Sequence, residues 1–290
     1  MPDSPDPPVK PDRTEGVGEM LAALERVIRP RQRLMTAYSG GVDSTVVAAV
    51  ARRVLGKSAA PAVIGDSPSL PRSELADAVA IAQQLDLELH VVQPAEQDDP
   101  GYIANAGDRC YYCKTHLYDT LQRAAQTLSV DWIANGTNTG DLGDHRPGLR
   151  AADEAQVVSP LLEAGLDKQG VRDVALHLGL SNADKPAAAC LASRIPYGTE
   201  VTPQRLAQVE QAEDAIRALG FTGFRVRHHG QVARIEVPES QMQQMLLPNV
   251  RQEVVSAMLR AGFLFAAIDL AGFRSGSGNV ALTVGQSTHA

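Results

Sequence analysis

The stretch best suited to binding or catalysis is "SGGVDS" at 39–44. It places two glycines, two hydroxyl groups and a carboxylate between two apolar runs. The runs predict a strand at 33–38 and a helix at 43–55. A helix N-terminus carries unpaired N–H groups and partial positive charge, and glycines allow the backbone to approach an anion closely. We therefore expect a phosphate or pyrophosphate to bind here, with a Mg²⁺ ion at Asp43. A capped turn with no ligand is the alternative interpretation.

The three cysteines are the second candidate group. Cys110 and Cys113 have CxxC spacing, which suits a redox pair, half of a zinc site or part of an iron–sulfur site. Cys190 stands in "KPAAACLASRIPYG", where a buried, inert cysteine is one interpretation. Lys185, Arg194 and the prolines of this stretch favour an exposed functional loop instead.

Composition limits the protein class. The chain has 290 residues, of which 44% are hydrophobic, and a net charge of −7. These values are typical of a globular protein and argue against a long nucleic acid as the main partner. No apolar run is long enough to span a bilayer. Residues 1–16 lack the features of a signal peptide, so we expect a disordered leader and a cytoplasmic protein.

Two sections of the chain have different hydrophobic patterns. Strand-like and helix-like segments alternate up to about residue 200, which predicts an α/β fold with a parallel sheet. The expected strands are 33–38, 59–65, 87–93 and 130–136, and the expected helices are 43–55, 71–85, 114–128 and 166–180.

The second section predicts a smaller α+β unit. Thr202 and Pro203 are typical of a helix start, and Gly220 is typical of its end. Strands are expected at 224–230, 232–238 and 263–269, with a helix at 250–262. We expect a leader at 1–16, an α/β domain at 17–200, a second domain at 201–275 and a flexible tail at 276–290.

The glycine-rich loop lacks the lysine of the GxxxxGK[ST] motif and resembles the signature of the PP-loop ATP pyrophosphatases. This resemblance implies that an acceptor oxygen attacks the α-phosphate of ATP, so that an adenylate forms and pyrophosphate leaves. It also implies ATP-binding roles, together with Mg²⁺, for the loop residues Ser39, Gly40, Gly41, Asp43 and Ser44. Ser67, Arg72, Gly136 and Asn138 follow the second and fourth expected strands, where ligands bind in open α/β sheets, so we expect them in the ATP site as well. Arg72 could instead only cap a helix, and Asn138 could only form a turn. Asp66, Asp141 and Asp144 stand in the same segments and could line the site or only form turns.

A closer resemblance extends from about residue 20 to 280. The stretches "GDSPSLPRSEL", "DRCYYCK", "NGTNTGDLGDHRPGLRAA", "DKPAAACLASRIPYG", "FRVRHHG" and "DLAGFRSGSGN" are similar to the LarE family, the ATP-dependent sulfur transferases of nickel-pincer nucleotide biosynthesis. The resemblance implies that a carboxylate of pyridinium-3,5-biscarboxylic acid mononucleotide is adenylated. Sulfur held at Cys190 then displaces AMP and gives a thiocarboxylate.

The resemblance leaves two sources of sulfur open. Members with three cysteines bind a 4Fe–4S cluster that carries an extra sulfide, which here implies Cys110, Cys113 and Cys190 as ligands. Members with the single cysteine give up its sulfur and retain dehydroalanine. We expect the cluster form; a purely structural role for Cys110 and Cys113 is the alternative.

Basic and acidic residues complete the expected site. The match to the family implies that Arg225 and Arg227 bind the substrate phosphate, and Arg194 could act similarly or in catalysis. Glu213 and Glu236 could serve catalysis or assembly, although Glu213 is expected to be solvated on its helix.

Two other functions remain open. Cluster-dependent tRNA thiolation is one, and a non-catalytic nucleotide or iron–sulfur sensor is another. The resemblance also implies a sulfide donor and a homo-oligomer, a hexamer, as partners, and we expect no nucleic acid or membrane partner.

Overall fold

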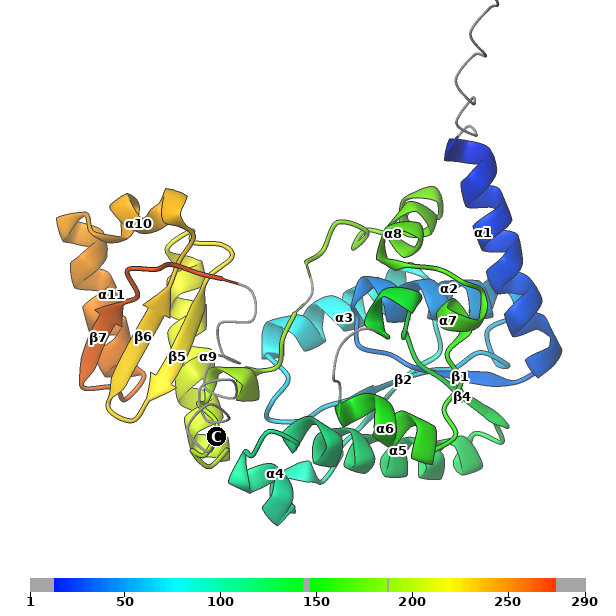
Figure 1. The fold of residues 1–290 in the computed structure, drawn as a ribbon, viewed down its shortest axis with the longest axis horizontal. Coiled ribbons are helices and arrows are strands. Elements are labelled where there is room, and N and C mark those ends of the chain that lie inside the picture. Colours follow the sequence, from blue (N-terminus) through cyan, green and yellow to red (C-terminus); the bar gives the residue numbers. More distant parts are fainter. Residues whose placement is uncertain (1–12, 143–146, 187, 275–290) are drawn as a thin grey trace, which may run out of the picture.

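The computed structural model describes residues 13–142, 147–186 and 188–274. Two units follow one another along the chain, each built around its own sheet (Figure 1). The first sheet is parallel and covered by helices on both faces, whereas the second is small and mixed. The predicted α/β fold with a smaller α+β unit is therefore confirmed.

The first sheet has the strand order β3-β2-β1-β4. The central strand β1 (Leu34–Ala37) pairs in parallel with β2 (Ala62–Gly65) and with β4 (Trp132–Ala134), and β3 (Leu89–Val92) extends the sheet beyond β2. Parallel strands bring their carboxyl ends to one edge of the sheet, where ligands bind in open α/β folds. The loops that follow β1, β2 and β4 therefore share this edge.

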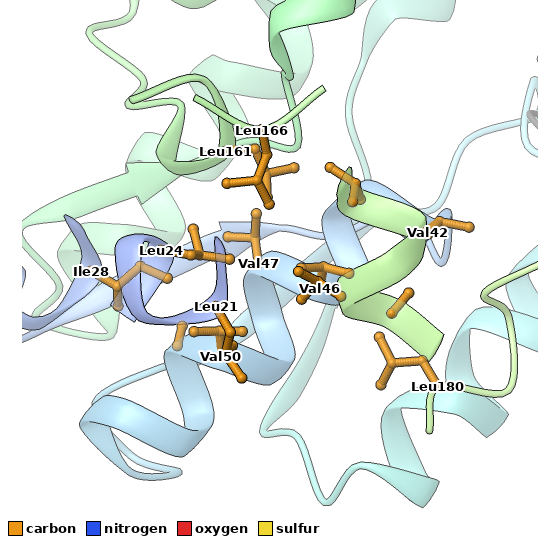
Figure 2. Close-up of a cluster of buried hydrophobic side chains, with 14 of the residues drawn as sticks. Leu21, Leu24, Ile28, Val42, Val46, Val47, Val50, Leu161, Leu166 and Leu180 are labelled. Atoms are coloured by element: carbon orange, nitrogen blue, oxygen red, sulfur yellow. The ribbon is translucent and has the colours of Figure 1, made fainter. Parts of the chain in front are cut away.

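Helices pack on both faces of this sheet (Figure 1). One face is covered by α1 (Arg13–Ile28), α2 (Val42–Leu55), α7 (Pro160–Glu163) and α8 (Lys168–His177), whose side chains form one core with Leu34. Figure 2 shows Leu21 and Leu24 of α1 beside Val46, Val47 and Val50 of α2. On the same side α3 (Arg72–Gln84) packs near α2.

The opposite face is covered by α5 (Arg109–Thr127) and α6 (Pro147–Glu154), which form a core with Met35. Leu34 and Met35 point to opposite faces because side chains alternate along a strand. The short α4 (Pro100–Ala104) leads into α5.

The second sheet has the order β5-β6-β7. Strands β5 (Arg225–His229) and β6 (Val232–Glu236) form an antiparallel hairpin, and β7 (Phe265–Ile268) pairs in parallel with β6. One face of this sheet forms a core with α9 (Pro203–Ala218) and α11 (Pro248–Arg260). The helix α10 (Glu239–Met245) precedes α11. None of the described helices, in either unit, combines the length and the apolar character that crossing a bilayer requires.

Two predicted boundaries were wrong. Helix α5 begins at Arg109 rather than 114, so Cys110 and Cys113 lie within its first five residues. Helix α1 begins at Arg13, within the segment expected to be a leader. The expected tail at 276–290 lies outside the described residues. The start of α9 was predicted correctly, since the Thr202 side chain accepts a hydrogen bond from the Arg205 N–H at 3.2 Å.

Candidate functional site

The loop between β1 and α2 has the geometry of an anion site. Gly41 is the N-cap of α2 in an extended conformation, and as a glycine it has no side chain to cap the first N–H groups of the helix. Gly40 has a φ of 72°, and a Cβ at this position would lie 2.6 Å from the Cβ of Ala78. Only glycine fits there, for both reasons. The free N–H groups and the helix dipole favour a bound phosphate.

The hydroxyl groups of the loop hold it in shape. The Oγ atoms of Ser39 and Ser44 lie 3.0 Å apart, and the Ser44 hydroxyl donates to the Gly41 carbonyl at 3.2 Å. From a distant part of the chain, the buried Asn182 donates through Nδ2 to the Gly40 carbonyl and to Thr45 Oγ1, both at 2.9 Å. The sequence analysis missed Asn182.

Asp43 lies beside the loop after β4. Asn138 Nδ2 donates to Asp43 Oδ1 at 3.0 Å, and Asn138 itself forms a capping box with Asp141. Burial is the main reason why the pKa of Asp43 is raised, and the nearby Asp141 raises it further despite the Asn138 hydrogen bond. Lys168 Nζ lies 3.4 Å from Asp141 Oδ1. A partly buried carboxylate at a helix N-terminus, with a lysine nearby, is suited to a Mg²⁺–phosphate complex.

Gly136 lies directly against the start of α2. A Cβ on Gly136 would lie 2.8 Å from the Ser44 nitrogen and 2.9 Å from the Asp43 Cβ. The predicted ATP residues 39–44, Gly136 and Asn138 are thus brought together. Asp144 lies outside the described residues.

Ser67 and Arg72 follow β2 at the same edge of the sheet, but their contacts are local. Arg72 Nη1 lies 2.5 Å from Asp66 Oδ1, and Nη2 donates to the Ser67 carbonyl at 2.8 Å. The Arg72 side chain is about half exposed, which leaves its nucleotide role a prediction.

The cysteines come from two segments. Cys110 and Cys113 lie three residues apart near the start of α5, hence on neighbouring positions of one helix face. Cys190 precedes the short 3-10 turn Leu191–Arg194. Cys110 and Cys190 are exposed, whereas Cys113 is half-buried. Burial, and next the charge of Cys190, raise the pKa of Cys113 to about 12. The structure thus brings the two segments close enough for their sulfur groups to influence one another.

The loop that carries Cys190 is fixed to the start of α5. Asn105 is buried in the left-handed conformation, and its Nδ2 donates to the carbonyls of Pro196 and Thr199 at 2.8 and 2.9 Å. Arg109 Nη1 donates to Asn105 Oδ1 at 2.5 Å and to the Ala192 carbonyl at 2.9 Å. The sequence analysis missed both residues, although an asparagine followed by "AGDRC" is a recognisable turn signal.

The donor chemistry fits an iron–sulfur cluster, because three thiol groups lie in one neighbourhood and thiolates are the usual ligands of such clusters. Within the described residues, however, no three His, Cys, Asp or Glu side chains are close enough together to hold a metal ion. Cluster binding therefore stays a prediction.

Two predicted residues form buried ion pairs. Arg194 binds both carboxylate oxygens of Glu213, and Arg227 Nη2 lies 2.9 Å from Glu236 Oε2. All four side chains are buried, so the expectation of a solvated Glu213 was wrong. The charges of Arg194 and Arg227 are thus largely neutralised within the protein.

Arg225 differs from these two arginines. Its side chain is half-buried, its Nη1 donates to the Phe224 carbonyl at 2.6 Å, and it forms no ion pair with a carboxylate in the described part of the chain. Burial lowers the pKa of Arg225, and the nearby Arg194 and Arg227 lower it further. A desolvated guanidinium among other cations is suited to an anionic ligand.

Comparisons with known proteins agree with this geometry. The family model described as NAD synthase matches residues 24–99, which include the loop and α2. The chain is 45% identical to an uncharacterized protein of Synechocystis sp., over 91% of this chain and 98% of that protein. It is 38% identical to the pyridinium-3,5-bisthiocarboxylic acid mononucleotide synthase of Lactiplantibacillus plantarum, over 91% and 95% of the two chains.

A more distant similarity covers part of the chain. The glutamine-hydrolyzing GMP synthase of Aeropyrum pernix is 28% identical over 47% of this chain and 28% of that protein. The extended match to the bisthiocarboxylic acid mononucleotide synthase decides the family. The chain belongs to the LarE family of adenylating sulfur transferases, within the PP-loop ATP pyrophosphatases.

Proposed function

We propose that this enzyme converts a carboxylate of pyridinium-3,5-biscarboxylic acid mononucleotide to a thiocarboxylate at the expense of ATP. One observation carries the proposal: the turn after Cys190 touches both candidate binding regions. The Leu191 N–H donates to the carbonyl of Ser69, in the loop after β2, at 2.8 Å. The Ser193 carbonyl accepts from Arg227 Nη1 at 3.0 Å. The sulfur-bearing residue therefore stands between the nucleotide edge and the arginines.

The first step is adenylation. The N–H groups at the start of α2 bind the phosphates, and Asp43 would hold a Mg²⁺, which when bound would supply positive charge to neutralise them. The substrate carboxylate oxygen attacks the α-phosphorus, an acyl-adenylate forms, and pyrophosphate leaves. AMP is a much better leaving group than an oxide ion, so the acyl carbon becomes reactive.

The second step is sulfur transfer. A sulfur nucleophile at Cys190 attacks the acyl carbon, the carbon–sulfur bond forms, and AMP leaves with the electron pair of the broken C–O bond. Arg225 holds the substrate phosphate, with Arg227 beside it. Arg194 fixes the Cys190 turn by donating to the Ala189 and Cys190 carbonyls at 2.7 and 3.1 Å.

We propose that Cys110, Cys113 and Cys190 hold a 4Fe–4S cluster, which when bound supplies exchangeable sulfide for this step. Support comes from the electrostatic influence of Cys190 and Cys110 on Cys113 and from the preference of such clusters for thiolate ligands. Sacrifice of the Cys190 sulfur is the competing route.

The test of the overall reaction is direct. The protein is incubated with ATP, Mg²⁺ and the mononucleotide, and AMP, pyrophosphate and thiocarboxylate are measured. Cys190→Ala should still release pyrophosphate and form the acyl-adenylate in a single turnover, but it should form no thiocarboxylate. A protein that yields no AMP with this substrate would instead be a sensor, and AMP formed only with tRNA would indicate a tRNA thiolase.

The source of the sulfur is tested by intact mass after the reaction. The cluster route leaves Cys190 at its original mass through several turnovers with added sulfide, and substitution of any one cysteine removes most of the bound iron. The sacrificial route gives one turnover and loss of the mass of H₂S at residue 190. Dehydroalanine in a cluster-loaded sample would contradict the preferred route.

We further propose that residues 17–200 act as the ATP domain and residues 201–275 as the substrate and assembly domain, in a cytoplasmic homo-oligomer of hexameric size. The second sheet, which carries Arg225 and Arg227, supports the substrate role. Light scattering after size-exclusion chromatography tests the hexamer, and a monomer would contradict it.

A further inference from the structure

Arg109 is a buried cation without a carboxylate partner. The residue lies directly before Cys110 in the first turn of α5 and is 4% exposed. It forms no ion pair with a carboxylate in the part of the chain that the structure describes, and its guanidinium carbon lies 5.8 Å from the ring centre of Tyr197. Removing a charge from water is costly unless a counter-charge is supplied. The fold therefore retains an unneutralised positive charge at this position.

Only one arm of the guanidinium is used for internal hydrogen bonds. Nη1 donates to Asn105 Oδ1 and to the Ala192 carbonyl, whereas Nε and Nη2 make no hydrogen bond within the described residues. Because the guanidinium is planar and rigid, the two bonds of Nη1 fix the direction of the remaining N–H groups. These donors are preorganised for an acceptor that the protein itself does not supply.

Two cysteines and two tyrosines lie around Arg109. Burial lowers the pKa of Arg109, but Cys190, Cys110, Tyr197 and Tyr102 together raise it. Ala192, whose carbonyl Arg109 binds, lies two residues from Cys190. The guanidinium is therefore placed between the two cysteine-bearing segments.

We propose that Arg109 is the anion-binding residue of the sulfur site and that its Nε and Nη2 donors hold a small sulfur anion, hydrosulfide, beside the cysteines. The inference rests on the proposed function, because it assigns a residue to the sulfide-using step. Binding is non-covalent, so no bond is made or broken at Arg109. The charge match explains why an arginine without a carboxylate is maintained in a buried position.

The first experiment needs no turnover. Cys110 and Cys190 of the full-length protein, treated with a chelator, are alkylated with iodoacetate and with iodoacetamide, and the two rates are compared by peptide mass spectrometry. Both reagents attack through the same thiolate, so the ratio of their rates reports the local charge. We expect Arg109→Gln to lower the iodoacetate preference at least about threefold. Arg109→Lys should retain it.

Arg123→Gln is the matched control, because Arg123 is an exposed arginine on the same helix. It should leave the ratio at both cysteines unchanged. An unchanged ratio in Arg109→Gln would overturn the proposal. If that variant does not fold, the wild-type protein provides the test. Its ratio of iodoacetate to iodoacetamide rates at Cys190 should exceed the ratio of a free cysteine peptide, and an equal ratio would also overturn the proposal.

The second experiment separates this inference from the proposed function. Arg109→Gln should need at least about tenfold more sulfide for half-maximal thiocarboxylate formation. Pyrophosphate release in a single turnover, which reports the earlier adenylation step, should stay near wild type. A wild-type enzyme that does not use added sulfide would contradict the sulfide-using function. The alkylation ratio would still test whether Arg109 binds an anion beside the cysteines.

Discussion

The guanidinium of Arg194 binds both carboxylate oxygens of Glu213, Nε to Oε1 at 2.9 Å and Nη2 to Oε2 at 3.0 Å, and both side chains are buried. Glu213 Oε1 also accepts from the Val226 N–H at 3.0 Å. One carboxylate thus joins the Cys190 turn to α9 and to β5. The position of the sulfur residue relative to the arginines depends on this ion pair.

Loss of one partner should therefore be costly. We expect Glu213→Ala to lower the free energy of unfolding by about 3–5 kcal/mol, because a buried guanidinium loses its counter-charge. Urea denaturation measures the change. The control is Asp214→Ala, which removes an exposed ion pair with Arg217 on the same helix and should cost less than about 1 kcal/mol. Equal costs would show that the Arg194–Glu213 pair is no more important than a surface contact.

The sequence predicted the nucleotide loop because its signals are local. Strand, glycines and helix follow one another within 33–55, and each is determined by neighbours along the chain. The partners of Arg194 were not predicted, because the contact joins different elements. The helical spacing of Val209, Glu213 and Ile216 is nevertheless a signal that Glu213 lies on the buried face of α9.

Contacts between distant segments were beyond the reach of the sequence pattern. Asn182 binds the Gly40 carbonyl across 142 positions of the chain, and Arg109 binds the Ala192 carbonyl across 83. Polar residues in loops are usually solvated, so neither position was singled out. Only the packing of the two loops shows that these side chains shape the site.

Asp43→Asn should separate activity from stability. The variant keeps a hydrogen-bonding side chain but loses the charge that holds Mg²⁺, so AMP formation should fall at least about 100-fold. Because burial raises the pKa of Asp43, the charged form is less favourable in the folded protein than in the unfolded chain. Its ionised state therefore subtracts from stability above the folded pKa. The unfolding free energy of Asp43→Asn at neutral pH should be equal to or higher than that of wild type.

The same shift fixes the sign of the pH dependence. Protons compete with Mg²⁺ for Asp43. An ordinary aspartate has a pKa of about 3.9, and because the pKa of Asp43 is raised, this competition begins at a higher pH than for an ordinary aspartate. The Mg²⁺ concentration needed for half-maximal AMP formation should increase as the pH falls through the Asp43 pKa. A Mg²⁺ requirement independent of pH would contradict the assignment.

Gly136→Ala should displace the start of α2. The new methyl group would lie 2.8 Å from the Ser44 nitrogen, so the helix must shift, at a cost of about 1–3 kcal/mol of stability. Because this shift displaces the nucleotide loop, the apparent affinity for ATP should fall as well. Gly18→Ala is the control, since Gly18 lies in the exposed part of α1 with no atom within 4 Å of the added Cβ. This change should stabilise the protein by about 0.5–1 kcal/mol and leave ATP binding unchanged.

Arg225→Ala should weaken the mononucleotide and spare ATP. Arg225 forms no ion pair with a described residue, so its guanidinium is the one of the three clustered arginines most ready to bind a phosphate. Loss of a hydrogen bond to a charged group costs about 1.5–3 kcal/mol of binding, which corresponds to about 10-fold to 150-fold in affinity. Calorimetry with each ligand measures both constants.

The control for Arg225 is Arg251→Ala, which removes an exposed arginine of the same unit, on α11. It should change neither affinity, and it corrects for the general loss of positive charge. Burial disfavours the charged form of Arg225, and the nearby Arg194 disfavours it further, so the variant should lose little stability. An equal loss of ATP and mononucleotide affinity would place Arg225 in the nucleotide site or in the fold, and the substrate phosphate would then need another partner.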